Sequence, residues 1–152
     1  MEFDPSRLRR GEVIAGASAV LLLVLMLLVK WYGSGGGSRS GWESLVGLRW
    51  LLVATIAAAF GLVITQATRR APAVPVTISL LVLVLGVISV LALIYRVLIN
   101  PPAHEQAGAF LGLISAIGIA YGGYLSLRQE GISRRDAPRE IPVVRAGRDN
   151  GA

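Results

Sequence analysis

Four long apolar runs, separated by short polar segments, constrain the fold of this chain more than any other feature. The first run, residues 13–29, contains no charged side chain, and the three later runs carry charges only near their ends. A helix of about 20 apolar residues crosses the roughly 30 Å hydrocarbon core of a bilayer, whereas helices of soluble proteins alternate polar and apolar faces. The sequence therefore predicts an all-α, polytopic membrane protein, a four-transmembrane-helix bundle with spans at about residues 13–31, 49–68, 76–99 and 107–127.

The composition agrees with this interpretation and excludes several kinds of site. Hydrophobic residues make up 54% of the 152 residues and charged residues only 16%, against about 25% charged in an average soluble domain. The chain has no cysteine and one histidine, so disulfides, thiolate chemistry and multi-histidine metal sites are excluded within one chain. We predict no catalytic, cofactor-binding or metal-binding residues, no cofactor and no enzymatic activity.

The net charge of +6 is assigned to membrane topology and not to nucleic-acid binding, because the positive residues flank the apolar runs. One side of the predicted bundle holds Arg7, Arg9, Arg10, Arg69, Arg70, Arg128, Arg134 and Arg135, and the other holds Lys30, Arg39, Arg49 and Arg96. The positive-inside rule places the first group in the cytoplasm. We therefore expect a cytoplasmic N-terminus over residues 1–12, a membrane domain over 13–128 and a disordered, basic cytoplasmic tail over 129–152.

The segments before and after the first run have alternative interpretations. A basic start followed by an apolar run also fits a signal peptide, but the run is long and no clear A-x-A site follows, so an uncleaved helix is favoured. The glycine-rich residues 33–41 predict a flexible loop. Residues 42–50, with Trp42 and Trp50 close to one helical face, predict an interfacial segment at the depth of the headgroups.

Arg49 and Arg96 are the charges most closely attached to apolar segments, and both fall near the predicted outer boundary. An arginine at the bilayer centre costs about 2.5–3.5 kcal/mol on insertion scales, so a position near the boundary is favoured. Both side chains can extend to the outer headgroups. Alternatively they form an outer-edge polar cluster with Glu43, Glu105 and His104, which either locks the outer loops together or binds an anionic headgroup.

Glu12 lies at the cytoplasmic edge of the first span, beside Arg9 and Arg10. It is interpreted as an edge residue. The alternative is a proton-coupling carboxylate of the kind used by small multidrug antiporters, which also have four helices in a short chain. Their acid, however, lies well inside the bilayer.

Small residues recur at intervals of four along the last apolar run. Gly108 and Gly112 begin one ridge, and Gly118 and Gly122 begin a second. Such spacing lets helix backbones approach closely in lipid. We predict that these glycines pack against another helix of the same chain, with homodimerisation or binding of another membrane protein as the alternative.

Four short segments carry a resemblance: GLRW before the second span, YRVLINPP closing the third, GAFLGL opening the fourth and GGYLSLRQEG ending it. Together they resemble uncharacterised small four-helix membrane proteins of high-GC actinobacteria. The resemblance covers residues 42–131 and implies a multi-pass protein of a bacterial plasma membrane, without a specific activity or site residue.

The leading functional hypothesis is a non-enzymatic structural or partner-binding membrane component, in contact with the lipid bilayer. The first alternative is a small oligomeric transporter or channel that uses the embedded arginines or Glu12. The second is an enzyme acting on lipid headgroups, for which His104 and Glu105 would have to perform acid–base chemistry.

Overall fold

The computed structural model describes residues 8–68, 75–101 and 104–135. Within these residues, four helices are long and apolar enough to cross a membrane, as predicted. They are α1 (Arg10–Leu28), α3 (Arg49–Ala67), α4 (Pro75–Ile94), which continues as the π-helical turn η2 (Tyr95–Ile99), and α5 (Ala107–Arg135).

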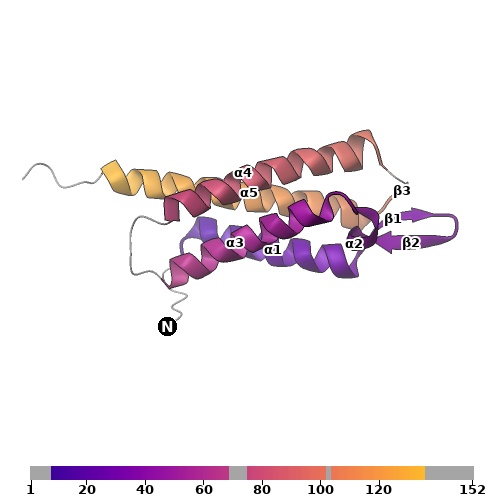
Figure 1. Ribbon diagram of the computed structural model, residues 1–152, viewed down its shortest axis with the longest axis horizontal. Helices are drawn as coiled ribbons and strands as arrows, with labels where there is room; N and C mark the ends of the chain where they lie inside the picture. The colour runs from indigo at the N-terminus through magenta and orange to yellow at the C-terminus, as the bar shows by residue number, and fades with distance from the viewer. Residues whose placement is uncertain (1–7, 69–74, 102–103, 136–152) are drawn as a thin grey trace, which may run out of the picture.

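The four long helices lie side by side and alternate in direction (Figure 1). α1 packs against α3 and α5, and α4 packs against the same two helices, so the first and last helices of the chain are neighbours. We call the end where α1 begins and α3 ends the terminal end, and the opposite end the sheet end. Both α1 and α5 have their chain-terminal turns at the terminal end.

The sheet end carries a small three-stranded antiparallel sheet, so the prediction of an all-α fold is incomplete. The strands are β1 (Lys30–Ser34), β2 (Gly37–Ser40) and β3 (His104–Glu105), in the order β2-β1-β3. The expectation of a flexible loop at residues 33–41 is corrected by the hairpin that β1 and β2 form. Gly35 and Gly36 make its two-residue turn.

The predicted interfacial segment, residues 42–50, becomes the short helix α2 (Gly41–Ser44), a turn and the first residues of α3. A capping box starts α2. The Ser40 hydroxyl accepts a hydrogen bond from the Glu43 backbone N–H at 3.4 Å, and the Glu43 carboxylate accepts one from the Ser40 N–H at 3.0 Å. Both exchanges satisfy backbone donors at the start of the helix.

Helix ends differ from the predicted boundaries where the backbone forces a change. α1 ends at Leu28, before the predicted boundary at residue 31, because Val29 is already extended and leads into β1. η2 ends at Ile99, because the next residue, Asn100, precedes Pro101 and a residue before proline is disfavoured in helical geometry. α5 continues to Arg135, so residues 129–135 are helical, and the rest of the predicted tail lies outside the described residues.

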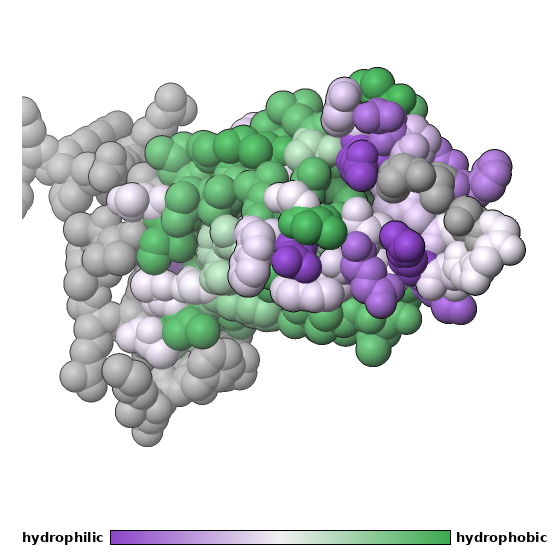
Figure 2. Space-filling model, turned by 45° about the vertical axis from the view of Figure 1, so that its right-hand side comes forward, coloured by the Kyte–Doolittle hydropathy of each residue, from purple (hydrophilic) through white to green (hydrophobic). Residues whose placement is uncertain are grey.

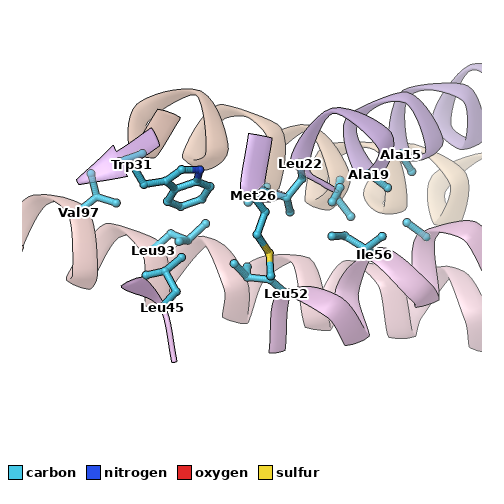
Figure 3. Packing of buried hydrophobic residues seen from close by; sticks show 14 of the residues in the cluster. Ala15, Ala19, Leu22, Met26, Trp31, Leu45, Leu52, Ile56, Leu93 and Val97 are labelled. Atoms are coloured by element: carbon cyan, nitrogen blue, oxygen red, sulfur yellow. The ribbon is translucent and has the colours of Figure 1, made fainter. Parts of the chain in front are cut away.

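Apolar side chains fill the space between the helices. Figure 3 shows them converging from α1, α3, α4 and η2, with Met26 pointing toward Leu52 near the centre of the view. The fully or almost fully buried members include Ala15, Ala19, Leu22, Met26, Leu52, Ile56, Ala59, Leu62, Val82, Leu93, Ala116 and Ile119.

Large apolar side chains also cover the outside of the bundle. Figure 2 shows hydrophobic residues along the helices and hydrophilic residues gathered toward the sheet end. Leu91 and Ile114, for example, are 62% and 61% exposed. A helix that is apolar on its outer face as well as its inner face is typical of a membrane span.

Candidate functional site

Trp31 anchors the sheet to the bundle at the sheet end. Its side chain is completely buried, and its indole N–H donates a hydrogen bond to the Leu25 carbonyl oxygen at 2.8 Å. The ring lies against Gly108 and Gly112 of α5, where a Cβ on either glycine would overlap it. These two glycines, predicted to face a helix, therefore accommodate a tryptophan from β1.

Gly118 and Gly122 face α1, as expected for packing within the chain. A Cβ on Gly122 would lie 2.5 Å from the Ala15 nitrogen and 2.6 Å from the Gly11 carbonyl oxygen. Gly118 lies against the Ser18 side chain. The α1–α5 contact is thus a backbone-to-backbone approach that only small residues permit.

Arg49 is held by aromatic rings. Its guanidinium carbon lies 5.3 Å from the ring centre of Trp42 and 5.6 Å from that of Trp50, within the range of a cation–π interaction. Glu43, its predicted partner, instead caps α2. The part of the chain that the structure describes therefore does not bring Arg49 and Glu43 together as an ion pair.

Arg96, Glu105 and Tyr32 do come together at the sheet end. The Tyr32 hydroxyl donates a hydrogen bond to the Arg96 backbone carbonyl at 3.3 Å, and Tyr32 is the β-ladder partner of Glu105. Burial raises the pKa of the Tyr32 phenol above its usual 10.0; the Arg96 charge partly lowers this pKa, and the Glu105 charge raises it further. His104 is exposed and pairs with Gly33 in the sheet.

A cleft of about 220 Å³ lies between η2 and the segment that joins α2 to α3. Its walls are almost entirely apolar, and Arg96 is the one charged residue among those that border it. The lining residues are Ser44, Leu45, Val46, Gly47, Leu48, Tyr95 and Arg96.

A second group of polar side chains, buried at the terminal end, was missed in the sequence. Glu12, Gln66, Ser79 and Ser126 are each at most 5% exposed, and each comes from a different one of the four long helices, in the half nearer the terminal end. The Ser79 and Ser126 hydroxyls are 3.1 Å apart, and the Glu12 carboxylate accepts a hydrogen bond from the Arg9 backbone N–H at 3.0 Å. Glu12 is therefore at the end of its helix, as predicted, but its side chain faces the interior.

Comparisons with protein-family models, with curated proteins and with solved structures find no match to this chain. The class of protein is therefore defined by the fold and its surface. Four helices of membrane-spanning length, apolar outside as well as inside, indicate a multi-pass membrane protein.

Proposed function

We propose that this chain is a non-enzymatic structural or partner-binding component of a bacterial plasma membrane, with both termini in the cytoplasm. The packed interior is the observation that carries the proposal. Apolar side chains such as Leu22, Leu52 and Leu62 fill the space between the helices and are completely buried. Such an interior supports a rigid membrane scaffold better than a conduit for polar solutes.

The orientation and the choice of membrane rest on further observations. Arg9, Arg10 and Arg128 are exposed and lie at the terminal end, and the positive-inside rule assigns that end to the cytoplasm. The resemblance to small actinobacterial membrane proteins supports a bacterial plasma membrane.

The sheet end is the surface that we propose for a partner, either another membrane protein or a second copy. The hairpin projects beyond the helices (Figure 1), and β2 is an edge strand of the sheet. An edge strand offers unpaired backbone groups to a second chain. Trp31, buried beneath the sheet, holds this surface in a fixed position on the bundle.

Site-specific photocrosslinking in native membranes tests the proposal. A photoreactive residue in place of Arg39, on β2, is expected to produce one discrete protein adduct, to be identified by mass spectrometry. The same residue in place of Ile114, on the lipid-facing surface, serves as the matched control and is expected to label lipid. Labelling of lipid alone at both positions would refute the proposed partner surface.

A small oligomeric transporter or channel is the second candidate, favoured by the buried carboxylate of Glu12. Ionisable groups inside membrane proteins often mark ion pathways. Proteoliposomes with an internal pH dye separate the two functions. Proton flux that Glu12→Gln abolishes would overturn the structural proposal in favour of a transporter or channel. Flux no higher than that of protein-free vesicles would support the structural proposal.

A further inference from the structure

We infer that the cleft between η2 and the α2–α3 segment binds an anionic phospholipid of the outer leaflet, through the phosphate-bearing head and the first chain carbons. The inference adds a ligand to the proposed function and rests on the membrane orientation given there. Its support comes from the size of the cleft, its unpaired arginine and its depth.

The size and lining of the cleft suit part of an amphiphile. Its volume of about 220 Å³ is below the roughly 300–1,000 Å³ of pockets that enclose a whole drug-sized ligand. Leu45, Val46 and Leu48 supply apolar walls on one side, and Tyr95 faces them from η2. A molecule that places one short segment here and leaves its remaining chains in the bilayer matches both the size and the polarity.

Arg96 supplies a positive charge that the protein itself does not neutralise. Among the residues that the structure describes, its guanidinium has no hydrogen-bond or ion-pair partner. Glu105, which pairs with Tyr32 in the sheet, is exposed on β3 and does not line the cleft. An anion beside apolar walls complements this combination, and an arginine guanidinium binds phosphate oxygens with two parallel hydrogen bonds.

The π-helical turn fixes the position of Arg96. The Asn100 N–H donates to the Tyr95 carbonyl oxygen at 2.8 Å, which closes the wide turn, and Tyr32 binds the Arg96 carbonyl from the sheet. Single π turns within α-helices occur frequently at functional sites. Because the backbone of Arg96 is held from two sides, a change of its side chain leaves the turn intact.

The tryptophans beside the cleft are the basis for placing it at the level of lipid phosphates. Trp42 of α2 and Trp50 of α3 flank the segment that lines the cleft, and they pack edge to face with ring centres 6.2 Å apart. Tryptophans and arginines concentrate at the boundary between hydrocarbon and headgroups. Val46, in the cleft wall, is 60% exposed and so continues the apolar surface from the cleft toward the lipid.

Native mass spectrometry of the full chain in a neutral detergent tests the inference. An anionic glycerol-headgroup phospholipid and a zwitterionic choline phospholipid with identical chains are titrated in turn, and the apparent Kd of the first lipid bound is measured. The anionic lipid is expected to bind about fivefold more tightly, which is the contribution of one arginine near an anionic surface. Arg96→Gln should remove the preference, and Arg96→Lys should keep most of it.

Lys30→Gln is the matched control, because Lys30 is an exposed cation at the same end and does not line the cleft. It should leave the preference unchanged. The inference is overturned if Arg96→Gln, with wild-type thermal stability, retains the preference for the anionic lipid. It is also overturned if Arg96→Gln and Lys30→Gln lose this preference equally. Saturation of the site by inorganic phosphate alone would equally contradict a lipid site. Photocrosslinking at Arg39 does not depend on lipid binding in the cleft. The proposed partner surface and the proposed lipid site can therefore fail separately.

Discussion

The contact between α1 and α5 makes the sharpest stability prediction. In Gly122→Ala, the new Cβ would lie 2.5 Å from the Ala15 nitrogen, 2.6 Å from the Gly11 carbonyl oxygen and 2.8 Å from the Ala15 Cα. All three are backbone atoms, so no side-chain rotation relieves the overlap and the two helices must separate. Overpacking of this kind costs about 1–3 kcal/mol, and backbone contacts favour the upper part of that range.

Gly61→Ala is the matched control for this prediction. Gly61 lies within α3, and a Cβ there would meet nothing within 4 Å. Both substitutions gain the same helix propensity, up to about 1 kcal/mol. The difference between the two variants therefore isolates the overlap and should be about 1–3 kcal/mol, with Gly122→Ala the less stable.

Equilibrium unfolding in mixed detergent micelles, followed by circular dichroism, measures this difference. Equal stability of the two variants would refute the reasoning, because it would mean that α1 and α5 do not approach as closely as described. A loss of stability in Gly61→Ala alone would also contradict the prediction, because it would place the close contact on α3 and not between α1 and α5.

Two further predictions concern the residues that attach the sheet to the bundle. Trp31→Phe removes the indole hydrogen bond to the Leu25 carbonyl and some ring volume, and should lower the free energy of unfolding by roughly 1–3 kcal/mol in the same assay; wild-type stability would contradict the anchoring role. Burial raises the folded-state pKa of Tyr32 above 10.0, so the stability contributed by its neutral phenol is complete below about pH 10 and is lost as the pH rises through the folded-state pKa. Tyr32→Phe should therefore lose less stability than the wild type when the pH is raised above 10, and an identical loss in both proteins would contradict the burial of this phenol.

The helices could be predicted from the sequence because length and apolarity alone specify a membrane-spanning helix. The sheet could not. β3 has only two residues, and its pairing with β1 joins segments that are distant in the chain. The glycine-rich loop contained a usable signal, since a Gly-Gly pair between two short segments also favours a hairpin turn. The glycine- and serine-rich composition of residues 33–41 instead predicted a flexible linker, because glycine is depleted in strands.

The glycines of α5 illustrate what spacing can and cannot predict. Their intervals correctly indicated that another part of the chain packs closely against the glycines. They did not indicate that the Trp31 ring lies against Gly108 and Gly112. A tryptophan placed by a strand has no fixed sequence distance from the helix that it contacts.

The polar side chains show a similar limit. Sequence position predicted that Arg49 and Arg96 lie near the ends of their helices, but it did not predict their neighbours, although Trp42 and Trp50 are close to Arg49 in the sequence. The buried group at the terminal end was missed because its members come from four different helices. No single helix carries a pattern that shows Glu12 facing inward.

Cysteine accessibility tests the central claim most directly, since the chain has no native cysteine. Gly36→Cys lies at the hairpin turn, where an added Cβ meets nothing within 4 Å, and Arg128→Cys lies at the opposite end. In sealed cells, a membrane-impermeant maleimide should label Gly36→Cys at once and Arg128→Cys only after permeabilisation. Labelling of both variants from the same side would contradict a four-span bundle with the sheet outside and the termini in the cytoplasm.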